Sequence, residues 1–543
     1  MKHLIVSAMA LAIALSTPVV AQTHDEAAEA RIRADVTFLA DDALEGRQTG
    51  QRGYDLAALY VQTRMMGLGL TPGVDGGWAQ PVSLARTGIA DEGATITWTP
   101  TGGAPVVWSN GQDALLNAGD VAGQETVTAG LVFVGYGIDS PAHGIDDYAG
   151  LDVDGKIVVI LSGAPSGLDS ETAAHLGTGK GAVAARHGAV GAITINTDAS
   201  AQRYTPAMMR RFATRTETTW IGADGKPHRA AATVRAGGLI SDEAAAVLFA
   251  GAAKSYADIR AEAAAEGGRP GGFALDGQAT FDIHTRRTDI HGANVIGVIP
   301  GSDPAVRDEM VVLTAHLDHL GLKPEGAADR VNNGALDNAG GVSIMLEAAR
   351  DLMANPPRRS VMVVALAAEE MGLLGSDYLA RNPVVPADKV VADVNLDMPI
   401  LTYDFTDLVA FGGEHSTLGQ IADRAVRAEG AILSPDPMPE QGVFTRSDHY
   451  SFVKAGVPSI MLATGYANGG EAAWGAFFGG AYHQPSDDMS VPFHWEAAVR
   501  FARVNAAIAR GIADAPERPM WYRGNSFGDQ FAPNAPKADK PTN

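Results

Sequence analysis

Two histidines and three carboxylates, widely separated in the second half of the chain, could together hold metal ions. They are His316, Asp337, Glu370, Asp397 and His483. Imidazole nitrogens and carboxylate oxygens both lie within the ligand preferences of Zn²⁺. Five such ligands can hold two adjacent ions if one carboxylate bridges the pair. The residue types therefore predict a co-catalytic centre with two zinc ions.

A pair of adjacent glutamates, Glu369 and Glu370, follows the apolar run Val361 to Ala368. Such pairs usually lie on a solvated helix face, but this run is typical of a buried strand. Successive side chains of an extended segment point to opposite sides. One glutamate could therefore bind a metal while its neighbour faces the water molecule that the metal activates. The pair Glu369 and Glu370 therefore fits one metal ligand and one general base.

The elements that must position these residues form an alternating α/β pattern. His316 follows the apolar run 310–315, Asp397 follows the run 390–396, and Asp337 precedes an apolar-periodic helix over 342–353. Taken singly, these motifs could be polar turns, or a helix cap in the case of Asp337. Open α/β sheets, however, bind ligands outside the carboxyl ends of their strands. The motifs together therefore predict a metal site at one edge of a sheet.

Five motifs carry a family resemblance. In chain order they are AHLDHLG (315–321), GALDNAGG (334–341), AAEEMGLLGS (367–376), NLDM (395–398) and YHQPSDD (482–488). In this order they resemble peptidase family M28, the zinc aminopeptidases with a phosphorylase/peptidase-like α/β fold. The resemblance covers residues 30–110 and 280–515. It implies a zinc exopeptidase fold, in which helices flank a mixed central sheet.

The resemblance also assigns roles to individual residues. It places His316 and Asp397 on one zinc, Glu370 and His483 on the other, Asp337 on both, Glu369 in proton transfer, and Asp318 as acceptor of the His316 ring N–H. Two zinc ions, for which Co²⁺ could substitute, would lower the pKa of a water molecule between them toward about 7. In the family, the free α-amine of the substrate binds beside the metals. The implied substrates are peptides with a free N-terminus.

Other functions stay open for the same set of residues. A carboxypeptidase or dipeptidase of the same superfamily would use the same ligands, and related single-zinc enzymes are glutaminyl cyclases. A non-catalytic binding protein is a third reading, although here every ligand is present. The segment Arg446 to Phe452 (RSDHYSF) resembles the part of the family that lines the substrate cleft, or it is a polar turn. We assign it no catalytic role.

Composition indicates a folded protein that does not bind nucleic acid. The chain has 543 residues, of which 46% are hydrophobic, enough for more than one core. Its 63 acidic and 41 basic residues give a net charge of −22. Phosphate binding requires clustered Lys and Arg, so nucleic acid is excluded as a partner. The chain contains no cysteine and therefore no disulfide.

The first 21 residues have the pattern of a secretory signal peptide. Lys2 precedes an apolar stretch over 4–15, and small residues end at Ala21, where we expect cleavage. The stretch is shorter than the roughly 20 residues that span a bilayer. A lipoprotein would need a cysteine at the cleavage site, and there is none. We expect a periplasmic or secreted protein without a stable membrane anchor.

Pattern changes along the chain suggest an interrupted catalytic domain. Its N-terminal part would span 25–114, its metal-binding part 263–520, and a β-rich insertion between them 115–262. The insertion resembles a protease-associated (PA) domain, with strands expected within 130–137, 155–163 and 189–196. A Gly-rich connector of low stiffness would follow at 267–277. The Pro-rich polar tail, 521–543, is expected to be disordered.

Overall fold

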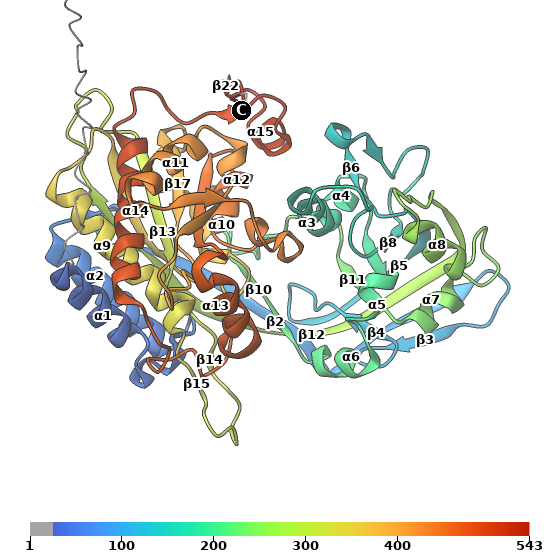
Figure 1. Cartoon of the computed structure of the whole chain (residues 1–543). Helices are drawn as coiled ribbons and strands as arrows, with labels where there is room; N and C mark the ends of the chain where they lie inside the picture. Colours follow the sequence, from blue (N-terminus) through green and yellow to red (C-terminus); the bar gives the residue numbers. More distant parts are fainter. Residues whose placement is uncertain (1–24, 542–543) are drawn as a thin grey trace, which may run out of the picture.

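The structure is a computed structural model that describes residues 25–541; the predicted signal peptide, 1–21, lies outside these residues. Two lobes share two long antiparallel strands, β2 (Ala79–Pro100) and β12 (Phe273–Ile299) (Figure 1). Their register runs from Ala79 opposite Val295 to Pro100 opposite Gly277. The lobes are therefore connected by continuous sheet. Among residues 25–541, no helix has the length and apolar character needed to cross a membrane.

The first lobe is built on a mixed sheet whose central strands are parallel. Its order is β19 (Ile432–Ser434), β18 (Asp407–Phe411), β20 (Ser459–Thr464), β17 (Val390–Asn395), β13 (Met310–His316), β16 (Ser360–Leu366) and β12. β13 is parallel to both β16 and β17, whereas β12 is antiparallel to β16. Every residue of β16 is buried, as expected for a parallel strand covered on both faces. The predicted mixed α/β fold is confirmed.

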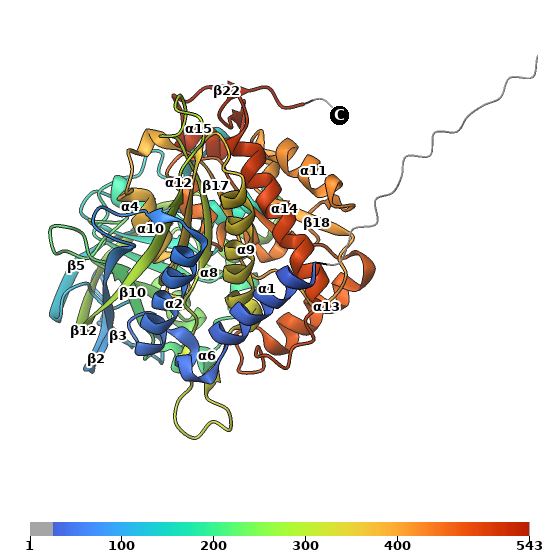
Figure 2. The same ribbon diagram turned by 90° about the vertical axis from the view of Figure 1, so that its left-hand side faces the viewer.

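Helices cover both faces of this sheet. One face carries α1 (Glu26–Leu39), α2 (Arg52–Leu68), α9 (Gly341–Ala354) and α14 (Trp495–Ala513) (Figure 2). The opposite face carries α10 (Leu374–Arg381) and α12 (His449–Lys454), and α11 (Leu418–Ala428) and α13 (Gly470–Ala476) complete the lobe. Alternate strand residues serve the two faces: Val311 packs into the core of the first group, Val312 into that of the second.

The second lobe is the β-rich insertion. Its sheet continues from β12 through β5 (Gly123–Phe133), β8 (Ile157–Leu161), β9 (Gly191–Ile195), β11 (Ala236–Ile240) and β4 (Ala114–Leu116), while β3 (Val106–Ser109) and β10 (Thr216–Trp220) pair with β2. Its helices are α3 (Ser170–Thr178), α4 (Lys180–Arg186), α5 (Asp198–Ala201), α6 (Pro206–Phe212), α7 (Asp242–Leu248) and α8 (Tyr256–Ala264). The three expected strands correspond to β5, β8 and β9.

Short two-residue strands complete the fold. They are β1 (Thr71–Pro72), β6 (Asp139–Ser140), β7 (Ile145–Asp146), β14 (Gly321–Leu322), β15 (Val331–Asn332), β21 (Trp521–Tyr522) and β22 (Lys537–Ala538). β14 and β15 pair with each other in the loop that links two predicted ligands, His316 and Asp337.

The core of the second lobe extends past the predicted boundaries of the insertion. It includes Ile89 and Trp98 on one side and Ile283 on the other. The reason is that β2 and β12 run without a break from one core into the next. The expected connector is also part of this sheet in its second half, since Phe273 to Leu275 pair in register with β5.

The expected disorder of the tail is wrong for residues 521–541. This stretch contains β21, α15 (Ser526–Phe531) and β22. Trp521 and Phe527 are each 2% exposed and belong to the main core. The Trp521 Nε1–H also donates a hydrogen bond of 2.9 Å to the Gly456 carbonyl. Two aromatic side chains thus anchor a segment whose average composition is polar.

Candidate metal centre

The five predicted ligands and Glu369 meet at the carboxyl edge of the central strands. His316 is the last residue of β13, Glu370 follows β16, and Asp397 follows β17. Asp337 lies in an irregular turn before α9, and His483 follows α13. All six side chains line one cleft of about 370 Å³.

The carboxylate of Asp337 lies between two groups of potential ligands. Its Oδ1 is 3.3 Å from His316 Nε2, which is itself 3.0 Å from Asp397 Oδ1. Its Oδ2 is 3.3 Å from His483 Nε2, which is also 3.3 Å from Glu370 Oε2. Adjacent corners of a tetrahedron with zinc–ligand bonds of about 2.0 Å are about 3.3 Å apart. The donor types and their spacing therefore fit two zinc ions that share Asp337.

The electrostatics of the cleft favour positive charge between the carboxylates. Burial alone would lower the pKa of His483, but hydrogen bonds to Asp337 and Glu370 outweigh it and raise that pKa to about 10. Burial alone would raise the pKa of Asp337, yet hydrogen bonds from the two imidazoles hold it far below its usual range. A divalent cation at this position would satisfy the same carboxylates.

The two glutamates diverge for a different reason from the one that strand alternation suggested. β16 ends at Leu366, and Ala368 has a left-handed backbone with φ of +55°. Glu369 and Glu370 therefore lie in a turn. The Glu370 carboxylate lies between His483 and His319, whose Nδ1 is 2.6 Å from Glu370 Oε1.

Asp318 does not contact His316 in the expected way. The His316 Nδ1 faces the backbone carbonyl of Asp318 at 3.2 Å. The carboxylate of Asp318 instead accepts a hydrogen bond of 3.0 Å from the Glu369 N–H. A backbone carbonyl that accepts Nδ1–H leaves Nε2 free to bind a metal. The tautomer is thus set by the main chain, while the side chain positions the glutamate turn.

His319 is a functional candidate that sequence reasoning missed. It is fully buried, and its Nε2 has no hydrogen-bond partner among the described residues. In the sequence, His319 is marked only as the second histidine of AHLDH. That spacing alone does not distinguish a functional histidine from one that is simply buried in the core. Because Nδ1 contacts a predicted ligand, His319 either orients Glu370 or competes for the same ion.

A buried arginine and an aspartate hold the loops that carry the ligands. Arg47, 1% exposed, donates to the carbonyls of Leu317 and Gly334 at 3.0 and 3.1 Å. It therefore fixes the chain on either side of the loop between His316 and Asp337. Asp487 accepts the N–H groups of Leu336 and Asp337, at 2.9 and 3.0 Å. Nothing in the local sequence around Arg47 marks these long-range contacts.

The RSDHYSF segment borders the cleft. Ser447 Oγ donates a hydrogen bond of 2.6 Å to Asp397 Oδ2 and accepts one of 2.7 Å from Asn395 Nδ2. Arg446 and Ser447 both line the cleft. This segment therefore positions a predicted ligand in addition to forming part of the cleft wall.

Two family models match the chain. The model of peptidase family M28 matches residues 294–509, which include every predicted ligand. The model of the PA domain matches residues 121–232, within the second lobe. The two matches fall in the two different lobes.

Individual relatives match only part of the chain. Aminopeptidase YwaD of Bacillus subtilis is 27% identical over 201 residues, 36% of this chain and 39% of that protein. Aminopeptidase Y of Saccharomyces cerevisiae is 27% identical over 252 residues, 45% of this chain and 42% of that protein. The chain thus spans well under half the length of these relatives. A solved aminopeptidase from Aneurinibacillus sp. strain AM-1 has a TM-score of 0.49 and 21% identity over 90% of this chain and 95% of that one.

Proposed function

Because residues 294–509 of this chain belong to peptidase family M28 and residues 121–232 to the PA domains, we propose that the protein is a two-zinc aminopeptidase. The observation that carries the proposal is the position of Asp337, whose two oxygens face two separate pairs of ligands. A carboxylate that offers one oxygen to each pair is suited to bridge two adjacent ions. The names of the two aminopeptidase relatives support the same reaction class.

The residues of the cleft have separate roles in metal binding and proton transfer. His316 and Asp397 would hold one ion, Glu370 and His483 would hold the other, and Asp337 would contribute to both. When bound, the ions would supply Lewis-acid activation of water and of the scissile carbonyl. Among the carboxylates that line the cleft, Glu369 is the one without a ligand role. It accepts the proton of the attacking water and delivers it to the leaving amine.

The side chains around the ligands maintain this arrangement. Ser447 and the carbonyl of Asp318 orient Asp397 and His316, while Asp487 fixes the backbone at Asp337. Such contacts keep the ligands in one geometry before substrate binds, which lowers the cost of reorganisation during the reaction. Peptides with a free N-terminus are the proposed substrates, with the α-amine beside the ions.

A panel of aminoacyl arylamides, each tested beside its N-acetylated counterpart, decides the reaction class. We expect hydrolysis of the free amines and none of the acetylated forms. Equal rates on both would contradict aminopeptidase action. Hydrolysis only of N-blocked peptides with a free C-terminus would indicate a carboxypeptidase, and cyclisation of N-terminal glutamine with one zinc per chain would indicate a glutaminyl cyclase.

We further propose that the mature protein is periplasmic or secreted, from the signal-peptide pattern of residues 1–21. N-terminal sequencing of protein recovered outside the cytoplasm should begin at Gln22. Recovery of an intact Met1 terminus in the cytoplasmic fraction would contradict this location.

A further inference from the structure

Three neighbouring hollows lie between the metal centre and the second lobe, the PA lobe, which contains residues 121–232 matched by the PA-domain model. The cleft of the metal centre shares Glu370 with a groove of about 590 Å³. That groove shares Arg215 and Glu217 with a cavity of about 570 Å³ in the PA lobe. Each hollow therefore borders the next one at a shared residue. The groove lies between the metal centre and the PA cavity.

The groove follows strand β10. β10 pairs antiparallel with β2, with Thr218 opposite Arg86, and with no other strand among residues 25–541. Arg86 Nη2 contacts Met371 Sδ at 3.7 Å, next to Glu370. Arg215 precedes Thr218 by three residues, which is about 10 Å along an extended strand. An unpaired strand edge of this kind can bind an extended peptide through main-chain hydrogen bonds.

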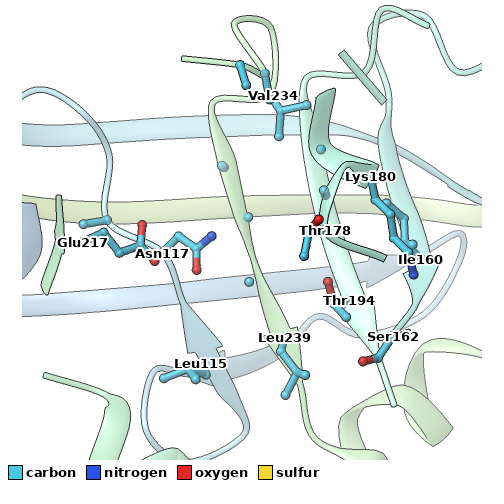
Figure 3. Close-up of a pocket in the computed structure, with 18 of the residues that line it drawn as sticks. Leu115, Asn117, Ile160, Ser162, Thr178, Lys180, Thr194, Glu217, Val234 and Leu239 are labelled. Atoms are coloured by element: carbon cyan, nitrogen blue, oxygen red, sulfur yellow. The ribbon is translucent and has the colours of Figure 1, made fainter. Parts of the chain in front are cut away.

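The PA cavity is polar and carries a surplus of positive charge. Asn117, Ser162, Thr178 and Thr194 line it together with the apolar Leu115, Val234 and Leu239 (Figure 3). Its basic residues are Lys180, Arg215, Arg229 and Arg235, and its acidic residues are Asp120 and Glu217. Because burial lowers the pKa of Lys180 to about 7, the surplus near neutral pH comes mainly from three arginines against two carboxylates. It contrasts with the net charge of −22 of the whole chain.

The arginines of the cavity differ in how fully they are neutralised. Arg229 forms an ion pair with Asp120, and Arg215 donates to Glu217 Oε1 at 3.0 Å. Arg235 is half exposed, and its contact with Glu125 is long, at 3.5 Å. Arg235 is therefore the cation best able to bind an added carboxylate.

We propose that the PA cavity is an extended subsite that binds a carboxylate of the peptide substrate, while its N-terminus lies at the metal centre and the intervening chain lies along β10. This inference rests on the proposed aminopeptidase function and deepens it. The stretch from Thr218 to Arg215 alone takes up about three residues of an extended peptide, so only a peptide several residues long can reach both sites. The carboxylate is either the C-terminus of a short peptide or an acidic side chain of a longer one.

Steady-state kinetics on four substrates test the subsite. One is an aminoacyl arylamide. The other three are hexapeptides with the same N-terminal residue: one with uncharged side chains and a free C-terminus, the C-terminal amide of that peptide, and a C-terminal amide with Glu at the sixth position. The enzymes are the wild type, Arg235→Gln, and Arg210→Gln as a matched control. Arg210 is an exposed arginine of α6 that does not line the cavity.

We expect the wild type to have a KM about tenfold lower for at least one carboxylate-bearing hexapeptide than for the neutral amide. Arg235→Gln should remove that difference, whereas kcat and all arylamide kinetics stay unchanged. Preference for the free acid identifies the C-terminus as the ligand, and preference for the Glu peptide identifies the side chain.

Two results would overturn the inference. One is equal KM values for all three hexapeptides in the wild type; the other is an equal response of Arg235→Gln and Arg210→Gln. Arylamide hydrolysis reports the proposed function separately, because that substrate is too short to reach the cavity. If the arylamide is not cleaved, fluorescence anisotropy of labelled versions of the three hexapeptides measures their binding to the cavity directly. The wild type should then bind a carboxylate-bearing hexapeptide more tightly than the neutral amide, and Arg235→Gln should lose this preference.

Discussion

The backbone N–H of Glu369 donates a hydrogen bond of 3.0 Å to Oδ1 of Asp318, which joins the turn after β16 to the turn after β13. The bond orients the peptide that precedes the Glu369 side chain. The backbone carbonyl of Asp318 faces His316 Nδ1, so one residue, Asp318, contacts both a predicted ligand and the proposed base. Adjacent glutamates can therefore hold different roles because the turn, rather than a strand, sets their directions.

The two glutamates should respond differently to substitution. Glu370→Ala removes a ligand, so zinc content and activity should fall together. Glu369→Gln should retain both ions and lower kcat by about 10² to 10⁴, the usual contribution of a positioned general base, with a smaller change in KM. Elemental analysis and steady-state kinetics on both variants measure this. Glu325→Gln, an exposed position, is the control. Loss of zinc from Glu369→Gln with retention in Glu370→Ala would reverse the assignment.

Metal removal should abolish activity. The purified protein is expected to contain close to two zinc ions per chain, because Asp337 serves two ligand pairs. Dialysis against a chelator should eliminate arylamide hydrolysis, and added Zn²⁺ or Co²⁺ should restore it. Undiminished hydrolysis in chelator, with no transition metal detected, would contradict the two-zinc proposal.

His319 is expected to orient Glu370 without binding an ion. His319→Ala removes the 2.6 Å contact to Glu370 Oε1, so the carboxylate loses a fixed direction. The zinc concentration for half-maximal activity should rise by about 10- to 100-fold, while saturating zinc restores two ions per chain. Metal titrations of this variant and of His284→Gln, a control in β12, provide the measurement. A variant that holds one ion even at saturation would show that His319 is itself a ligand.

Lys180 in the PA lobe should make stability depend on pH. Burial lowers the pKa of Lys180 to about 7 from an ordinary value of 10.5. Between these values the unfolded state binds more protons than the folded state, so the free energy of unfolding rises with pH. Lys180→Met removes this pH-dependent contribution to the free energy of unfolding. The free energy of unfolding of the variant, relative to the wild type, should therefore decline from pH 7 to pH 10. Calorimetric unfolding across this range tests the slope, with the exposed Lys226→Met as a pH-independent control. A constant difference for Lys180→Met would contradict the lowered pKa.

The sequence determined the sheet and the ligand types. Continuous apolar runs such as 310–315 and 390–396 are long enough for buried strands and carry a polar residue immediately after them. Parallel strands bring those residues to one edge, so His316 and Asp397 could be placed together before the fold was known. Local pattern was sufficient there because strand direction alone decides which ends meet.

Only the tertiary structure decided the contacts that join distant segments. The anchoring of the tail by Phe527, the role of Arg47 in the ligand loops, and the groove from Glu370 to Arg215 all depend on residues far apart in the chain. The turn at Ala368 likewise replaced the expected strand alternation. Burial and hydrogen bonding of this kind depend on which surfaces meet after folding, and no local periodicity encodes that choice.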